Sequence, residues 1–187
     1  MTNVKGGTKD FSLSQDPNTA QIWISNSGRS FAAKDIVDGG FLELVRYGIR
    51  DPHDPVIVNT VKVIDAVLKD PDVKIGICYH CYNNDRYGQG PNGEAWYDNA
   101  PFGTGRPWPL LTGERGHYEV ACGNDATVYL RSIEAYAGSR GLIPEQIWNF
   151  PNRVNPTFYN SGPTGSAMPQ GLRTTFSGPT HHFFLRF

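Results

Sequence analysis

The sequence predicts an all-α fold, and three observations lead to that prediction. Apolar residues recur at the three- and four-residue spacing of a helix in several segments. Long stretches rich in glycine and proline separate these segments, as expected of elaborate loops. Little of the chain alternates apolar and polar residues in the manner of a strand. Helices joined by long loops are typical of an all-α domain.

The N-terminal part carries the weakest pattern. Residues 1–35 are polar, with brief alternation at Gln21–Ile24, and we expect an irregular or weakly extended entry segment. Asp38 is placed to cap a short helix, and Gly48 lies just past its end. The apolar residues of this helix are Phe41, Leu44 and Val45.

A clearer helix begins at Asp54 and Pro55. An acidic cap can accept free backbone N–H groups, and proline suits the first turn. The helix is expected to stop at Asp70-Pro71. Its apolar residues share one face, and they are Ile57, Val61, Ile64 and Leu68.

Two more helices follow a long loop. Residues 76–105 have no helical period and many aromatic residues, which favours an ordered loop with room for a small hairpin. Pro107 opens the third helix, and Asn124-Asp125 caps the fourth, which ends at Gly138 or Gly141. The expected stripes are Leu110, Leu111, Tyr118 and Ala121, then Tyr129, Ile133, Tyr136 and Ala137. After Pro144 the chain is again loop-like.

Charge and hydropathy exclude several classes of partner. Seventeen basic and eighteen acidic residues give a net charge of -1, so electrostatics offers no case for nucleic acid or an anionic membrane surface. No apolar run approaches the roughly 20 residues of a membrane span. Residues 1–7 lack a hydrophobic segment of signal-peptide type, so we expect a cytoplasmic protein or a leader outside this chain.

Two carboxylates stand out as candidates for chemistry. Hydrolysis of a glycosidic bond needs two carboxyl groups, and Glu145 after Pro144 suits one of them, although an exposed loop glutamate fits the local sequence better. Glu114 lies on the apolar stripe of the third helix and therefore needs a partner, so a buried structural carboxylate is preferred to a catalytic one. Its possible partners are Arg106, Arg115 and His117. Glu119 and Glu134 are interpreted as solvated.

The cysteines give a weak metal or redox signal. Cys78-Tyr-His-Cys81 has C-x-x-C spacing, but structural zinc needs four ligands and no second pair follows. A thioredoxin-type site needs a strand-to-helix context that is missing here. Three cysteines also argue against a disulfide framework. We expect no metal site and no cofactor.

Five strings together resemble the bacterial branch of glycoside hydrolase family fifteen, the glucoamylases and glucodextranases. They appear in family order with family-like spacing, and the resemblance covers roughly residues 9–169. The strings are Asp38–Arg50, Asp54–Lys69, Gly105–Glu119, Gly141–Trp148 and Gly162–Pro169.

The resemblance implies an (α/α)6 barrel that releases glucose, with inversion, from the non-reducing ends of α-glucans such as maltooligosaccharides. About four or five of the twelve barrel helices fit in 187 residues. The family's general base lies in a Pro-Glu-Gln motif, which here gives Glu145 and overrides the interpretation from local sequence. Substrate contacts carry over to Trp108 and, with weaker support, to Tyr82 and Tyr87.

The chain also departs from the family pattern. The family's general acid precedes the region that this chain matches, so the missing N-terminal part of the barrel is an expected partner. In the substrate loop, Cys81 replaces an arginine and Arg86 replaces a glycine. Residues 36–169 form the expected catalytic part, and residues 170–187 an atypical tail. The alternative is a non-catalytic remnant or complementing fragment with weak carbohydrate binding.

Overall fold

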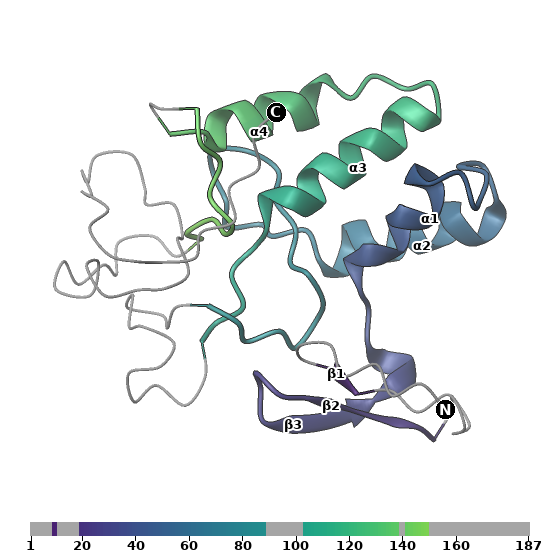
Figure 1. Ribbon diagram of the computed structural model, residues 1–187, viewed down its shortest axis with the longest axis vertical. Helices are drawn as coiled ribbons and strands as arrows, with labels where there is room; N and C mark the ends of the chain where they lie inside the picture. Colours follow the sequence, from purple (N-terminus) through teal and green to yellow (C-terminus); the bar gives the residue numbers. More distant parts are fainter. Residues whose placement is uncertain (1–8, 11–18, 89–102, 139–140, 150–187) are drawn as a thin grey trace, which may run out of the picture.

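The computed structural model describes residues 9–10, 19–88, 103–138 and 141–149 (Figure 1). These residues are mostly helical, with four α-helices, two short 3-10 helices and one small sheet. The elements are β1 (Lys9–Asp10), β2 (Gln21–Ile24), β3 (Arg29–Ala32), η1 (Ala33–Asp35), η2 (Gly39–Leu42), α1 (Glu43–Arg46), α2 (Pro55–Val67), α3 (Pro109–Ala121) and α4 (Thr127–Tyr136). None of the described helices combines the length and apolar character that crossing a bilayer requires.

The entry segment, expected to be irregular or weakly extended, contains a small three-stranded sheet. Its antiparallel strands run in the order β1-β2-β3, and Gln21 pairs with Ala32 in a hairpin. Ile22 and Ile24 are buried, whereas Trp23 between them is 47% exposed. The two isoleucines pack against Tyr82, which is far away in sequence. An alternation of four residues is too short to predict a sheet from sequence. The contact that buries these strands comes from a distant part of the chain, which a local pattern does not reveal.

The first two helical segments largely confirm the prediction. Asp38 caps η2 by accepting a hydrogen bond from the Gly40 N–H at 2.8 Å, and α1 continues from it. Gly48 beyond α1 has a φ of +68°, the left-handed conformation that glycine favours. Leu44 was expected to face inward but is exposed, and Leu42 takes its place beside Val45.

Helix α2 has the boundaries and the buried face that the sequence predicts. The Asp54 carboxylate accepts from the Val56 N–H at 2.9 Å, and Pro55 is the first helical residue. The helix ends at Val67, just before the predicted stop. All four predicted apolar residues are buried, namely Ile57, Val61, Ile64 and Leu68.

Helix α3 starts two residues later than expected. Pro107 and Trp108 precede the helix, and the extended Trp108 donates its N–H to the Tyr79 carbonyl at 2.7 Å. This contact replaces the helical hydrogen bonding that an earlier start would need. Leu110 and Ala121 are exposed, contrary to the predicted stripe. The buried helical face carries Leu111, Thr112, Glu114, Arg115 and Tyr118. In α4, Ile133 and Tyr136 are buried as expected.

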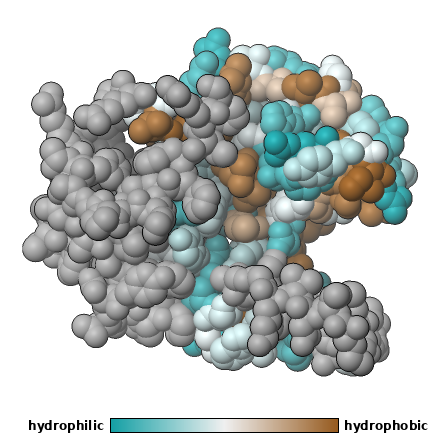
Figure 2. Space-filling view, in the orientation of Figure 1, coloured by the Kyte–Doolittle hydropathy of each residue, from teal (hydrophilic) through white to brown (hydrophobic). Residues whose placement is uncertain are grey.

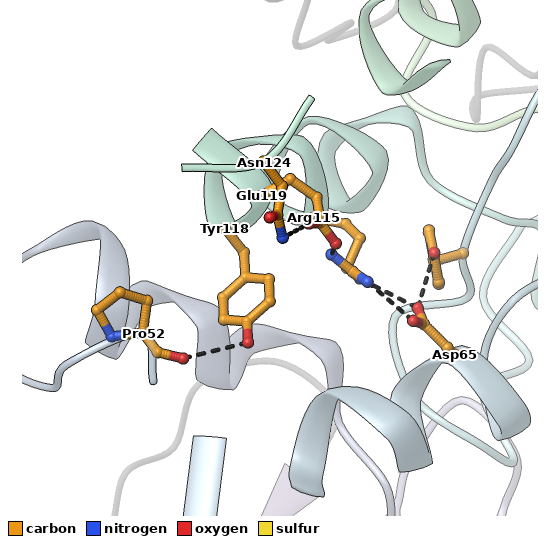
Figure 3. A network of polar contacts seen from close by, with 7 residues as sticks. Pro52, Asp65, Arg115, Tyr118, Glu119 and Asn124 are labelled. Carbon is orange, nitrogen blue, oxygen red and sulfur yellow. Dashed lines mark hydrogen bonds and ion pairs between the residues drawn. The ribbon is translucent and has the colours of Figure 1, made fainter. Parts of the chain in front are cut away.

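A polar network ties α2 to α3 (Figure 3). The Arg115 guanidinium donates to both carboxylate oxygens of Asp65, at 3.1 and 2.9 Å, and also to Glu119. Glu119 is therefore a partly buried ion-pair partner, which corrects the prediction that it is solvated. Glu134 is exposed, as predicted. Helix α3 also packs along α4 and α1, with the sheet at the far end of the molecule (Figure 1).

Candidate active site

Two aromatic rings form the centre of the candidate site. Tyr87 and Trp108 stack with ring centroids 5.6 Å apart and an interplanar angle of 27°. Tyr87 lies at the end of the described part of the long loop, and Trp108 immediately precedes α3. Both rings are half-buried. Half-buried stacked aromatic rings provide an apolar face against which a ligand can pack.

The segment that carries Glu145 is held beside this aromatic pair. The Ile147 N–H donates to the Pro107 carbonyl at 2.9 Å. The Gln146 amide donates to the carbonyls of Arg106 and Tyr87, at 3.3 and 3.4 Å. The two residues that follow Glu145 are thus bonded to the backbone of Tyr87 and to the backbone of the two residues that precede Trp108.

The Glu145 carboxylate differs from the other carboxylates of this region. It is half-buried, and within the described residues it takes part in no hydrogen bond or ion pair. Burial raises the pKa of Glu145 above its usual 4.5, and no nearby group opposes that effect. A half-buried carboxylate that is left unpaired is a suitable proton acceptor near neutral pH.

Two glycines of the long loop pack closely against other parts of the chain, Gly88 against the side chain of Gln146, the neighbour of Glu145, and Gly105 against the backbone of Asp85. Gly88 has a φ of +103°, and a side chain there would begin 2.3 Å from the Gln146 amide oxygen. Gly105 has a φ of +66°, and a Cβ there would lie 2.1 Å from the Asp85 carbonyl oxygen. Glycine is therefore required at both positions if these segments are to approach one another as they do.

A buried asparagine connects the hairpin to the long loop. The Asn26 amide donates to the Tyr82 hydroxyl at 2.9 Å and to the Asp85 carboxylate at 2.7 Å. Its carbonyl oxygen accepts from the Arg86 N–H at 3.3 Å. Burial raises the pKa of Asp85, and the hydrogen bonds to Tyr87, Asn26 and Tyr82 oppose that rise. Tyr82 is only 4% exposed and belongs to the core under the loop.

The two substitutions noted in the substrate loop are accommodated without backbone strain. Asn84 is the non-glycine residue with positive φ among those described, at 64°, and asparagine tolerates this conformation well. Arg86 is exposed and does not adopt a positive φ. Cys81 is partly buried and packs against two core clusters, one that contains Ile24 and one that contains Tyr79. Its carbonyl oxygen accepts from the Gly39 N–H at 2.8 Å.

A second polar network crosses the base of the loop. One ring nitrogen of His80 lies 2.9 Å from the Asp70 carboxylate, and the other lies 2.7 Å from the Gly105 carbonyl oxygen. Asn149 donates to the same Asp70 oxygen at 2.6 Å and accepts from Arg106 at 2.7 Å. The Arg106 guanidinium lies 3.8 Å from the centre of the Trp148 ring. The network thus connects three separate segments.

Glu114 occupies a different place, at the contact between α1 and α3. It is buried and shares a hydrogen bond with Glu43, and not with any of the three partners that the sequence suggested. Burial, followed by the bond and charge of Glu43, raises the pKa of Glu114 to about 7. The pKa of Glu43 is lowered, since its bonds to Glu114 and Tyr47 and the nearby Arg46 outweigh its slight burial. The protonated form of Glu114 can therefore donate to the Glu43 carboxylate.

The cysteine motif does not gather metal ligands in the described residues, where no group of three or more His, Cys, Asp or Glu side chains is placed to hold a metal ion. Burial raises the pKa of Cys78 to about 12. A thiol that stays protonated at neutral pH is a poor nucleophile and a poor metal ligand.

Comparison with known proteins identifies the family. Residues 8–173 match the family described as "Glycosyl hydrolases family 15". The chain belongs to this family. The chain is also similar to a glucoamylase of Clostridium sp. (strain G0005), with 48% identity over 134 residues. That match covers 71% of this chain and 18% of the glucoamylase.

A solved glucoamylase structure matches this fold. The crystal structure of a bacterial glucoamylase complexed with acarbose superimposes with a TM-score of 0.59 and 42% sequence identity. The match covers 73% of this chain and 19% of that structure. The mostly helical fold thus corresponds to part of the glucoamylase (α/α)6 barrel, and the chain spans about a fifth of its relatives' length.

The structure places the Glu145 segment beside Trp108 and Tyr87, three of the residues singled out in the sequence. Tyr82 instead lies in the core, and Glu114 lies on α3 at its contact with α1. Sequence reasoning missed Asn26 and the network around His80. No local pattern signals either, because their partners lie 10 to 79 positions away along the chain.

Proposed function

We propose that this chain forms part of the active site of a glucoamylase-type glycoside hydrolase, in which Glu145 is the general base. One observation carries the proposal: Glu145 is a half-buried carboxylate without a partner among the described residues, and the residues after it are bonded to the backbone beside the Tyr87–Trp108 pair. Structural carboxylates of this chain, such as Asp70 and Asp65, are paired instead.

The proposed reaction is an inverting hydrolysis. Glu145 takes a proton from a water molecule, and the water oxygen attacks the anomeric carbon while a general acid protonates the departing glycosidic oxygen. An inverting pair stands about 6.5–9.5 Å apart to leave room for that water. The general acid lies outside the region of the family that this chain matches, and another part of the barrel supplies it. The raised pKa of Glu145 strengthens it as a base.

Trp108 and Tyr87 are the proposed sugar contacts. Their stacked rings suit the apolar face of a glucose unit. The Trp108 indole N–H has no hydrogen-bond partner among the described residues, and a buried donor of this kind gains most from a ligand oxygen. Tyr82 is buried with its hydroxyl bonded to Asn26, so its proposed role is to support the loop.

A second candidate is a non-catalytic remnant or a complementing fragment that binds α-glucans weakly. A change in the substrate loop favours it. Cys81, in place of the arginine of relatives, removes donors suited to sugar hydroxyls.

Glucose release by a chimera separates the two candidates. The matching segment of the Clostridium glucoamylase would be replaced by this chain, and glucose release from maltooligosaccharides measured. We expect activity with the native chain and a loss of 10²–10⁴-fold in kcat with Glu145→Gln, because the amide cannot accept the proton. Acarbose binding should be largely kept.

The matched control is Glu134→Gln, on the exposed face of α4, which should leave kcat unchanged. Normal turnover by Glu145→Gln would remove Glu145 from the role of base. The chimera could instead fold and bind acarbose but release no glucose, with either Glu or Gln at position 145. This result would favour the non-catalytic remnant. Mixing the separate chain with an N-terminal barrel part then tests complementation.

A further inference from the structure

The surroundings of His80 determine the protonation state of its ring. One ring nitrogen faces an Asp70 carboxylate oxygen at 2.9 Å, and the other faces the Gly105 carbonyl oxygen at 2.7 Å. Carboxylate and carbonyl oxygens only accept hydrogen bonds. A neutral imidazole has a single N–H, so it can satisfy one of these contacts and must leave the other as a repulsion between two acceptors. Both contacts are made only when both nitrogens carry protons.

His80 also connects the chain segments that carry the residues of the candidate site. It belongs to the start of the loop that carries Tyr87, and Gly105 begins the strand-like stretch that leads to Trp108. Asp70 extends the connection, because Asn149 bonds to the same Asp70 oxygen at 2.6 Å. Asn149 lies four residues after Glu145, so the chain of contacts runs from the loop to the Glu145 segment.

Resting on the function proposed above, we propose that His80 is a positioning residue held as an imidazolium, whose two N–H donors fix the Tyr87 loop, the Trp108 stretch and the Glu145 segment together. It touches neither the proposed substrate nor the water. Its loss would displace Glu145 and Trp108 relative to each other.

The charges that face His80 support this state. Asp70 is almost fully buried and lies against the ring, and Asp85 adds a second negative charge nearby. The cation of Arg106 is directed to Asn149 and Trp148. Burial opposes a charge on the ring, but the bonds to Asp70 and Gly105 more than offset it, so the pKa of His80 lies above the usual 6.5.

The first test is nitrogen NMR of the full chain, labelled at its histidine rings and titrated between pH 5 and 9. We expect both ring nitrogens of His80 to carry protons at pH 7. The ring signals that disappear in His80→Gln are those of His80 among the five histidines. Asp70→Asn should move the titration of His80 to lower pH. A neutral His80 ring at pH 7 overturns the inference.

The second test asks whether His80 acts through position. In the active chimera, the single amide nitrogen of His80→Gln cannot stand in the places of both ring nitrogens, so one of the two contacts is lost. We therefore expect kcat to fall about tenfold or more with little change in KM. The alkaline decline in rate that follows deprotonation of His80 should also disappear. His53→Gln should behave as wild type. An unchanged kcat and an unchanged alkaline limb would overturn the positioning role.

The outcomes of these tests remain separate from the role of Glu145. The NMR result is independent of hydrolysis, so a neutral His80 refutes this inference alone. Full activity of Glu145→Gln refutes the proposed function and leaves the protonation state of His80 as measured.

Discussion

Glu145 and Glu114 are two carboxylates whose pKa is raised by burial, yet their neighbours give them different chemistry. Glu145 has no partner among the described residues, so its lone pairs remain available to a water molecule. Glu114 is bonded to Glu43, and its proton is held between two carboxyl groups. A shared proton of this kind stabilises the contact between helices and is not free to take part in hydrolysis.

Glu114 therefore predicts a pH dependence of stability. Its pKa is about 7 in the folded state, raised from 4.5. Between these two pH values the folded state therefore keeps a proton that the unfolded state has already released. This contribution is fully present below pH 4.5 and is lost as the pH rises through about 7. Glu114→Gln keeps a donor to Glu43 at every pH, so its free energy of unfolding should exceed that of wild type by about 1–3 kcal/mol at pH 8.

Urea denaturation at pH 5, 6.5 and 8 measures this effect. His80 also has a raised pKa and loses its contribution at alkaline pH, so the difference between wild type and Glu114→Gln isolates the carboxyl pair. Glu134→Gln serves as the exposed control. Parallel stability curves for wild type and Glu114→Gln would contradict the shared proton.

The sequence predicted the burial of Glu114 but not its partner, and the reason is physical. The helical spacing of apolar residues predicts that Glu114 faces inward, and this spacing can be seen within one short segment. Glu43 lies 71 positions earlier, and only the packing of α1 on α3 brings it close. Arg115, the neighbour in sequence, points instead to Asp65 and Glu119 (Figure 3).

At the scale of elements, the hairpin of β2 and β3 acts as a support for the loop that carries Tyr87. Asn26, in the turn of this hairpin, makes three hydrogen bonds to residues of that loop. We expect Asn26→Ala to destabilise the fold by about 1–3 kcal/mol, because buried groups on the loop lose their partners. Hydrogen exchange of residues 82–88 should quicken.

The control for this change is Asn59→Ala on the exposed side of α2, which should alter the free energy of unfolding by less than about 0.5 kcal/mol. Equal exchange rates in wild type and Asn26→Ala would mean that the loop holds its shape without the hairpin.

The elements also separate what a sequence can predict from what it cannot. The boundaries of α2 follow from a capping aspartate, a proline and a helical stripe, all within one window, and they were predicted correctly. The start of α3 was predicted two residues early because the bond between Trp108 and Tyr79 holds the preceding residues extended. For the sheet, the sequence predicted only weak extension at Gln21–Ile24, because the buried isoleucines pack against Tyr82, which is distant in sequence.

At the scale of the whole molecule, the described residues leave apolar side chains on the surface (Figure 2). A group of them lies in the turn after α1 and the first turn of α2, where Tyr47, Ile49 and Val56 are 68%, 65% and 68% exposed. In a barrel, each helix buries faces against its neighbours, and a chain that matches a fifth of a glucoamylase presents such faces to solvent.

We therefore expect the isolated chain to associate through this surface. Sedimentation equilibrium should show a mass that rises with protein concentration. The double substitution of Ile49→Glu and Val56→Glu should weaken the association constant about tenfold or more. It removes two apolar contacts, whose burial is worth roughly 25 cal/mol per Å², and it adds charge. Ser30→Glu with Asn59→Glu adds the same charge at exposed polar positions and should change it little. If both pairs weaken association equally, net charge and not this apolar surface governs it. A strictly monomeric chain at all concentrations would mean that helices α1 and α2 tolerate solvent without their barrel neighbours.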